Sequence, residues 1–281
     1  MSHPSPSSIA ARRQAFKALH ASGCFIIPNP WDVGSARYLQ GLGFKALATT
    51  SSGYAWSQGK PDGGASRDEV LAHLKDLVGA TDLPVNADFE SGYASDAQGV
   101  HESVTLAIET GVAGISIEDA SGDSSAPIRS LDEALARLKA ARRAIDEAGG
   151  DVMLIGRAEN HLHGVDDLAD TIARLKAYSE AGADCLYAPG IRTPEQISAV
   201  VAAVAPKPVN LLVGSASPMT LQEIAAMGVR RVSVGGALAR SAWGGFIQAA
   251  NTLAKEGRFS GFTQAASGQV LNDFFDKGKL P

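Results

Sequence analysis

The sequence predicts a (β/α)8 barrel, because eight short apolar runs alternate with longer amphipathic segments along its 281 residues. Each run lacks polar alternation over most of its length, which is typical of parallel strands covered on both faces. Eight strand–helix units of roughly 30 residues fit the chain, and a parallel sheet of that size closes most naturally as a barrel. An open doubly wound sheet is the competing fold. No Gly-x-Gly-x-x-Gly motif follows the first strand, which weakens its dinucleotide-binding version.

The expected elements follow these runs in order. Strands are expected at residues 25–29, 46–50, 84–89, 114–118, 152–156, 185–188, 209–213 and 231–235. Helices are expected between them, for example at residues 66–79, 96–110, 131–148, 165–181, 194–204 and 220–227. Ser66, Ser130 and Thr193 stand directly before helical segments and can cap them. Gly111 and Gly182 stand at helix ends and lead into the next strand.

A further helix is expected at residues 265–276, beyond the eighth unit. It carries Leu271, Phe274 and Phe275 on one side, so it must cover apolar surface in its own barrel or in a neighbouring one. The domain organisation that follows is one barrel domain over residues 1–281. Residues 1–8 are expected to be a disordered N-terminal extension, and residues 257–281 a C-terminal helical extension.

Composition narrows the class of protein. Apolar residues make up 45% of the chain and charged residues 20%, an ordinary globular balance. A net charge of -5 gives no broad basic face, so nucleic acid is not an expected partner. Cys24 and Cys185 form no CxxC pair and are expected to be reduced and buried, as in a cytoplasmic protein. No secretory signal and no apolar stretch of about 18 residues is present, so no membrane partner is expected.

Polar residues gather where the expected strands end. Asn86, Asp88 and Glu90 alternate at the end of the third strand, and Glu118 ends the fourth. In barrels of this type, the C-terminal ends of the strands point into the active site. Carboxylates crowded there need a cation to stay ionised, and oxygen ligands favour Mg²⁺ or Mn²⁺ over Zn²⁺. The alternative is that some of these acids, Glu90 and Asp119 in particular, cap helix N-termini or face solvent.

Cationic and hydroxyl groups stand at other strand ends. Arg157 follows the fifth strand, and its fork suits a substrate carboxylate or a salt bridge to Glu118 or Glu159. The turn at residues 51–53, Ser-Ser-Gly, offers hydroxyls and backbone N–H groups to a carboxylate or phosphate. Of His161 and His163, one could act as an acid or base, although a solvated loop is the simpler interpretation.

The same residues carry a resemblance to a known family. Residues 84–93 read Pro-Val-Asn-Ala-Asp-Phe-Glu-Ser-Gly-Tyr, residues 114–119 Gly-Ile-Ser-Ile-Glu-Asp, and residues 155–159 Ile-Gly-Arg-Ala-Glu. Together with Asn-Pro-Trp-Asp-Val-Gly-Ser-Ala-Arg at 29–37 and Lys-Pro-Asp-Gly at 60–63, this order resembles the isocitrate lyase/phosphoenolpyruvate mutase superfamily. The resemblance implies a (β/α)8 barrel that binds Mg²⁺ and a 2-oxo acid and stabilises an enolate-like intermediate. It also implies a homodimer or homotetramer that exchanges its eighth helix.

Site residues are carried over from the resemblance position by position. Asp88 is expected to hold the metal directly, and Asp62 and Glu118 directly or through water. Arg157 is expected to bind the substrate carboxylate. The remaining expected substrate-binding residues are Ser51, Ser52, Gly53 and, by a looser match, Asn210.

Two departures from the family pattern bear on the reaction. Asn86 stands where the family has the first acid of its metal pair, and Glu90 is an additional acid that is expected to serve as a ligand instead. Residues 119–127 read Asp-Ala-Ser-Gly-Asp-Ser-Ser-Ala-Pro, without the lysine and cysteine of the isocitrate and methylisocitrate lyases.

Three functions are therefore open, with Asp62, Glu118 and Arg157 as the expected catalytic residues. The leading one is a Mg²⁺-dependent lyase or decarboxylase acting on a small 2-oxo or 2-hydroxy dicarboxylic acid such as oxaloacetate. The second is a mutase or hydrolase of a P–C bond. The third is a barrel that binds an oxo acid without catalysis.

Overall fold

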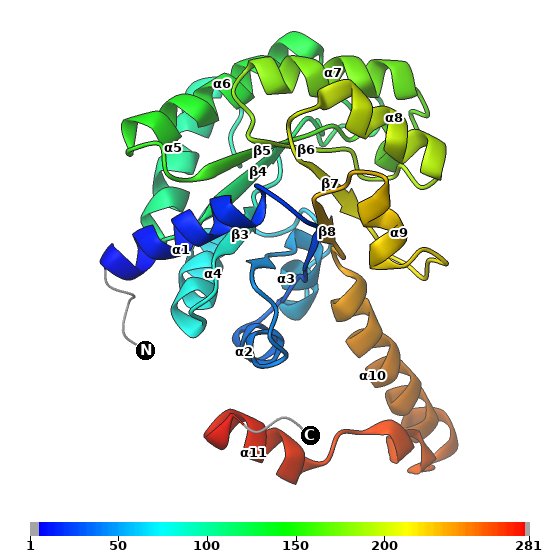
Figure 1. Cartoon of the computed structure of the whole chain (residues 1–281). Helices are drawn as coiled ribbons and strands as arrows, with labels where there is room; N and C mark the ends of the chain where they lie inside the picture. The colour runs from blue at the N-terminus through cyan, green and yellow to red at the C-terminus, as the bar shows by residue number, and fades with distance from the viewer. Residues whose placement is uncertain (1–5, 279–281) are drawn as a thin grey trace.

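Eight parallel strands form the centre of the computed structural model, which describes residues 6–278 (Figure 1). Neighbouring strands pair in the order β1-β8-β7-β6-β5-β4-β3-β2. At the remaining seam, the backbone N–H of Ala48 donates to the carbonyl of Pro28 at 3.1 Å. The predicted (β/α)8 barrel is confirmed. The strands are β1 (Phe25–Ile27), β2 (Leu47–Ala48), β3 (Val85–Asp88), β4 (Gly114–Glu118), β5 (Met153–Arg157), β6 (Cys185–Tyr187), β7 (Val209–Leu212) and β8 (Arg231–Ser233).

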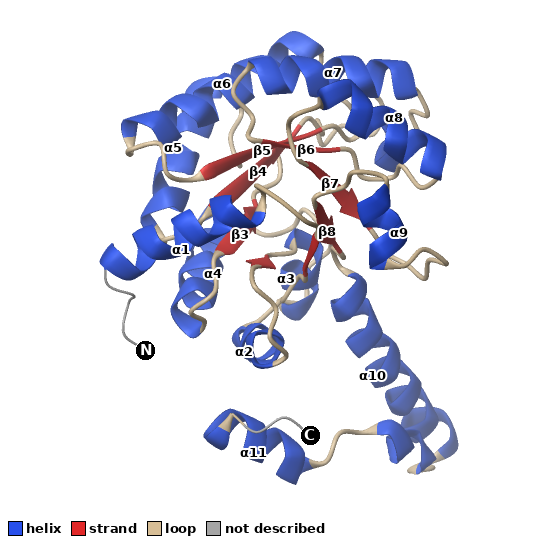
Figure 2. Ribbon diagram, viewed as in Figure 1, coloured by secondary structure: helices blue, strands red, loops and turns tan. Residues whose placement is uncertain are grey.

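Helices surround the strands (Figure 2). Those that follow β2 to β7 are α3 (Ser51–Ser57), α4 (Arg67–Ala80), α5 (Ala97–Glu109), α6 (Leu131–Glu147), α7 (Leu168–Glu180), α8 (Pro194–Val204) and α9 (Leu221–Ala226), with α2 (Val33–Gly41) after β1. The predicted caps Ser66, Ser130 and Thr193 each form a capping box with the residue three positions on. Local capping chemistry thus fixes where these helices begin.

The strand register brings the polar strand ends close together. Asp88 pairs with Ser116, Glu118 with Arg157, and Arg157 with Tyr187 across three neighbouring ladders. Because parallel strands all point the same way, side chains from β3 to β6 meet at the C-terminal mouth of the barrel.

Two segments differ from the sequence-based expectations. Residues 6–8, expected to be disordered, begin helix α1 (Pro6–Leu19), while residues 1–5 lie outside the described part. The helix is held because Phe16 is fully buried and Arg13 donates to the carbonyls of Ile108 and Val112, each at 2.9 Å. The expected turn at 51–53 is instead the first turn of α3, because the Thr50 hydroxyl accepts from the backbone N–H of Gly53 at 3.3 Å.

The C-terminal segment leaves the barrel. Helix α10 (Ala237–Glu256) projects outward in Figure 1, and within it only Ala239 is buried. After the short helix η2 (Ser260–Gln264), α11 (Gly268–Lys277) returns to α2, where the Tyr38 and Phe274 rings lie 4.9 Å apart. The predicted tail helix is present and starts three residues later than expected, after Ser267. It covers α2 of its own chain, and helix exchange between subunits stays a prediction.

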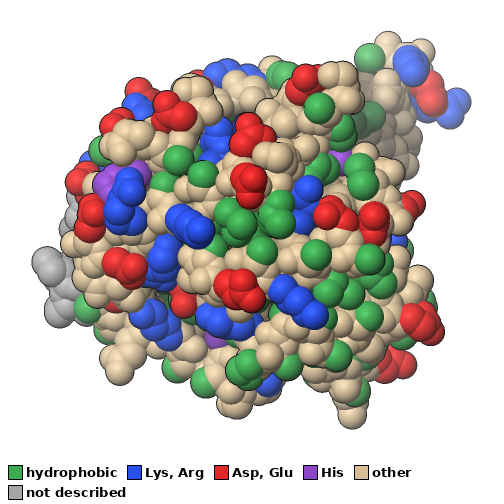
Figure 3. Space-filling model, turned by 90° about the horizontal axis from the view of Figure 1, so that it is seen from above, with side chains coloured by type: hydrophobic (Ala, Val, Ile, Leu, Met, Phe, Trp, Pro, Cys, Tyr) green, Lys and Arg blue, Asp and Glu red, His purple; other side chains and the backbone are tan. Residues whose placement is uncertain are grey.

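The surface carries both signs of charge. Figure 3 shows basic and acidic side chains interspersed on the face seen from above. Among residues 6–278, no helix combines the length and apolarity that crossing a bilayer requires.

Candidate active site

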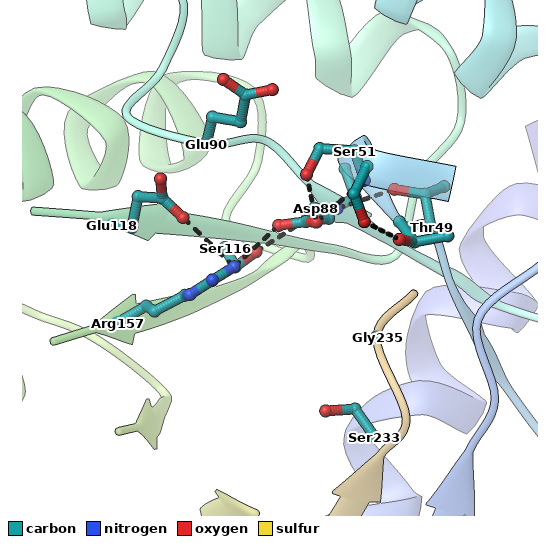
Figure 4. A network of polar contacts seen from close by, with 12 residues as sticks. Thr49, Ser51, Asp88, Glu90, Ser116, Glu118, Arg157, Ser233 and Gly235 are labelled. Carbon is teal, nitrogen blue, oxygen red and sulfur yellow. Dashed lines mark hydrogen bonds and ion pairs between the residues drawn. The ribbon is translucent and has the colours of Figure 1, made fainter. Parts of the chain in front are cut away.

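A cluster of acids surrounds one arginine at the mouth of the barrel (Figure 4). Nη1 of Arg157 lies 3.0 Å from Oδ1 of Asp88 and 3.1 Å from Oε2 of Glu118, and its Nε contacts Oε1 of Glu159. The three acids come from the ends of β3 and β4 and from the segment after β5. Both salt bridges that the sequence left open for Arg157 are therefore formed, and Asp88 adds a third.

The environment of Arg157 keeps it charged. Burial alone would lower its pKa, but Glu159 and Glu118 outweigh burial and raise the pKa well above its usual value. The guanidinium also lies over the ring of Tyr187, 5.1 Å from the centroid. Within residues 6–278, the remaining nitrogen Nη2 donates to no acceptor. Arg157 thus retains one nitrogen without a hydrogen-bond partner, on a side chain that is 13% exposed.

Asp88 is oriented by the segment after β2. Its Oδ2 accepts from both the backbone N–H and the hydroxyl of Ser51, each at 3.0 Å. Its own N–H donates to Oγ1 of Thr49 at 2.8 Å. Ser51 therefore binds Asp88 in this structure, and its expected contact with substrate stays a prediction. The polar end of β2 holds the central acid in place.

Ser52 and Gly53 occupy different positions. Ser52 lines the large cleft at the barrel mouth, with its hydroxyl 3.1 Å from that of Thr50. Gly53 is buried, and a Cβ there would lie 2.6 Å from Cγ2 of Thr50. Its N–H is bonded to Thr50 and it does not line the cleft. The glycine is needed for close packing at this point.

Three acids at the mouth, including Glu118 of this cluster, have raised pKa values. Burial, followed by the charge of Asp88, raises the pKa of Asp62, although the N–H of Gly63 opposes the shift. Burial raises the pKa of Glu90 to about 6, despite a 2.8 Å hydrogen bond from the Tyr93 hydroxyl. Burial also raises the pKa of Glu118 well above its usual value, against the effect of Arg157. Acidic neighbours add to each shift, so a bound cation would stabilise the ionised forms.

The donor chemistry of this cluster fits a hard divalent cation. Asp62, Asp88, Glu90 and Glu118 supply only oxygen ligands, which Mg²⁺ prefers. Among residues 6–278, however, no three His, Cys, Asp or Glu side chains already stand in a metal-binding arrangement. Figure 4 shows Arg157 reaching toward Asp88 and Glu118, while the Glu90 carboxylate points away. A metal site here requires these side chains to turn toward a common centre.

Asp119 and Glu159 form the support behind the cluster. Asp119 accepts from the Tyr178 hydroxyl at 2.6 Å, from Arg174 at 3.1 Å and from the N–H of Glu159 at 2.8 Å. Nε2 of His163 lies 3.6 Å from Oε2 of Glu159. All these contacts of Asp119 are to other parts of the protein, so its role is to support the structure. Glu159 in turn holds Arg157 through its contact with Nε.

A separate polar group lies inside the barrel. Arg231 is buried and donates from Nε to Oδ1 of Asn210 at 2.8 Å and from Nη1 to Oδ1 of Asn86 at 3.4 Å. The Asn210 amide nitrogen donates to Ser233 at 2.9 Å. Asn210 thus has both ends of its amide bonded and does not line the cleft. The expected contact of Asn210 with substrate stays a prediction, and in this structure both polar atoms of its side chain are already bonded within the protein.

Sequence reasoning missed Thr49, Tyr187 and Arg231. Thr49 directly follows β2 and Tyr187 ends β6, much as the predicted acids end β3 and β4, so strand-end position was a usable signal. Arg231 opens β8, and a charge inside an apolar run indicates a buried polar partner.

The sequence relationships agree with this geometry. Residues 16–254 match the family model described as phosphoenolpyruvate phosphomutase. The chain belongs to this family. The predicted membership in the isocitrate lyase/phosphoenolpyruvate mutase superfamily is confirmed, which places the chain in a superfamily of lyases and mutases.

Individual relatives give a more detailed comparison. An oxaloacetate decarboxylase of Paraburkholderia xenovorans is 32% identical over 231 residues, covering 79% of this chain and 74% of the relative. A protein of Burkholderia cenocepacia with a crystal structure is 48% identical in sequence, and its description names both lyase and mutase. The match has a TM-score of 0.93 and covers 98% of this chain and 100% of that one. Oxaloacetate acetylhydrolase bound to its product oxalate is 28% identical with a TM-score of 0.81, covering 98% and 99%.

Proposed function

We propose that this chain is a Mg²⁺-dependent lyase or decarboxylase that cleaves a carbon–carbon bond in a small 2-oxo or 2-hydroxy dicarboxylic acid such as oxaloacetate. The observation that carries the proposal is the open Nη2 edge of Arg157 inside a cluster of acids at the barrel mouth. Relatives named for reactions of oxaloacetate support the choice of substrate.

Arg157 would bind the carboxylate next to the oxo group. A planar guanidinium binds carboxylates with directional, charge-assisted hydrogen bonds. Its Nε is held by Glu159, which is not one of the proposed metal ligands, so this contact would orient the guanidinium even when Asp88 and Glu118 turn toward the ion. A fixed donor loses little conformational freedom on binding, which favours a defined orientation of the reacting bond.

Asp62, Asp88, Glu90 and Glu118 would hold the Mg²⁺ ion. The bound ion would act as a Lewis acid on the oxo group and the electrons that develop there. Ser51 would keep Asp88 oriented through its two hydrogen bonds. Without the ion, Glu90, with a pKa of about 6 and Tyr93 bonded to Oε1, would take up a proton on Oε2 as the pH falls through about 6.

The segment after β4 fits decarboxylation. Residues 119–127 contain no lysine or cysteine, and backbone bonds between Ser121 and Pro127 and between Arg129 and Asp119 close the segment on itself. Loss of CO₂ leaves an enolate directly, so the reaction needs no external base to begin.

The test is pyruvate formation from oxaloacetate, followed by coupled NADH oxidation, with Mg²⁺ and again after chelation. Because Mg²⁺ itself speeds the loss of CO₂ from oxaloacetate, the Arg157→Lys protein under the same conditions is the background. We expect turnover above that background only with metal. Equal rates before and after chelation would remove the metal from the proposal, and no turnover above background would overturn the decarboxylase assignment.

The second candidate is P–C bond chemistry, which the description of the matching family favours. Phosphorus NMR of phosphonopyruvate and phosphoenolpyruvate incubated with the protein separates it from the first. Conversion of either compound in the absence of oxaloacetate turnover would replace the leading proposal.

A further inference from the structure

The cleft at the barrel mouth is larger than the reaction site requires. It has a volume of about 740 Å³ and meets that site at Asp62, whose pKa responds to Asp88 and Arg157, although neither of these two residues lines the cleft. This volume corresponds to about 25 molecules of liquid water, and pockets of about 300–1,000 Å³ hold drug-sized ligands. A four-carbon diacid would leave most of this space filled with water.

The cleft extends across the mouth toward the segments after β6 and β7. Asp62 and Ser52 belong to the segment that follows β2, on the opposite side of the barrel. The far part is walled by apolar side chains, namely Leu162, Ile191, Leu212, Val213 and Met219. Leu162 is 48% exposed, so an apolar ligand segment would remove hydrophobic surface from water.

Two arginines stand in this far part. Arg192 follows β6, and its guanidinium forms no ion pair with any residue of the described chain. Arg240, near the start of α10, donates to the carbonyl of Gly214 and likewise has no acidic partner among residues 6–278. Among the described residues that line the cleft, Asp62 is the one acid, and it lies at the reaction site. The far part is therefore cationic and the near part acidic.

We propose that the substrate is a chain-extended 2-oxo or 2-hydroxy diacid, with its reacting end at Asp62 and the acidic cluster beside it, an apolar middle along Leu212 and Leu162, and a distal anion at Arg192 and Arg240. This inference rests on the proposed function and specifies the substrate class of the same site. It distinguishes this chain from an enzyme built for oxaloacetate alone, since both charge and apolar surface continue beyond the length of that acid.

The experiment measures binding and enolisation without assuming which bond breaks. Straight-chain 2-oxo diacids from four to eight carbons are titrated calorimetrically with the full-length protein and Mg²⁺. Exchange of their C3 hydrogens in D₂O is followed by proton NMR, with protein-free rates subtracted. 2-Oxooctanoate, a monoacid of the longest chain, separates the distal anion from chain length.

We expect affinity to rise with chain length and to exceed that for oxaloacetate by about tenfold or more in the longer diacids, because one charge-assisted contact is worth at least that factor. The monoacid should not reproduce the full gain. In Arg192→Gln the ratio of long-diacid to oxaloacetate affinity should fall about tenfold. The matched control is Arg143→Gln, at a 54% exposed side chain on α6, which should keep the wild-type ratio.

The outcomes separate the two levels of the argument. If oxaloacetate is bound best and Arg192→Gln leaves the ratio unchanged, the chain-extended substrate is wrong while the proposed function stands. If the monoacid matches the diacid, the distal anion is wrong. If no 2-oxo acid binds or exchanges, the proposed function itself fails.

Discussion

Replacing Arg157 with methionine tests whether this side chain holds the acidic cluster together. The substitution keeps a long unbranched side chain and removes the charge. Its partners Asp88, Glu118 and Glu159 have side chains that are 18%, 14% and 2% exposed, so water cannot replace the lost contacts fully. Removing one partner of a buried ion pair costs about 3–5 kcal/mol. We expect the free energy of unfolding to fall by about that amount at pH 7.

The loss should shrink in acid. In the wild type, burial would raise the pKa of Glu159, but Arg157 outweighs it and lowers the pKa below 4.5. A carboxylate with a lowered pKa contributes stability that is present above its unfolded value and lost as the pH falls. Without Arg157, the buried acids can take up protons instead of remaining as unpaired charges. The difference between wild type and variant should therefore decrease from pH 7 toward pH 4.5.

The assay is urea unfolding followed by circular dichroism, at pH 7 and pH 5, with and without millimolar Mg²⁺. If the acids bind the ion, Mg²⁺ at about one hundred times its Kd should raise the free energy of unfolding by about 2.7 kcal/mol at pH 7. Arg143→Met, at an exposed site on α6, should change stability by less than about 0.5 kcal/mol. An Arg157→Met protein as stable as this control would refute the argument about the cluster, and no effect of Mg²⁺ would refute the metal site.

Three further predictions concern other parts of the molecule. Burial, then the charge of Arg231, lowers the pKa of His20 from 6.5 to about 3, so the folded state resists a proton that the unfolded state accepts. Stability should fall as pH decreases below 6.5, by about 1.4 kcal/mol per pH unit, and urea titrations of His20→Gln should lack this part of the slope. Asn86→Asp should raise the free energy of unfolding by about 1–3 kcal/mol, because it gives Arg231 a charged acceptor; lower stability in urea would contradict this. Phe246 on α10 is 62% exposed, so Phe246→Asp should reduce a dimer or tetramer to smaller species in light scattering, whereas an unchanged mass would count against helix exchange.

The fold could be predicted from the sequence because its signals are local. Apolar runs, serine and threonine caps and terminal glycines each reflect the chemistry of a few adjacent residues. Helix α1 was not predicted because contacts with residues distant in sequence hold it in place. Phe16 packs against β4, where a Cβ on Gly114 would lie 2.7 Å from the Phe16 ring. The Ser-Ser-Gly segment was taken as a turn because these residues favour turns, whereas the Thr50 cap converts it into a helix start.

The positions of the site residues could also be predicted, but not their pairing. Strand-end placement identified Asp88, Glu118 and Arg157, because the barrel brings all strand ends to one mouth. Which atoms touch depends on rotamers and on residues far apart in sequence. Ser51 was expected to face the substrate, and its hydroxyl instead bonds Asp88 across 37 positions of sequence. Arg231 was missed because its partners lie on other strands.

The charge balance of the mouth gives a final reason to expect a cation. Five acids influence one another's environment here, namely Asp62, Asp88, Glu90, Glu118 and Glu159. Within the described residues 6–278, Arg157 is the one cation in direct contact with three of them. A dianionic substrate entering such a site would meet net negative charge unless protons or a metal ion compensated it. The raised pKa values of Asp62, Glu90 and Glu118 indicate that the cluster gains protons more readily than ordinary acids do. The affinities of this site for protons and for Mg²⁺ should therefore be opposed, so that Mg²⁺ binds more tightly as the pH rises through about 6, and a metal affinity independent of pH would contradict this account.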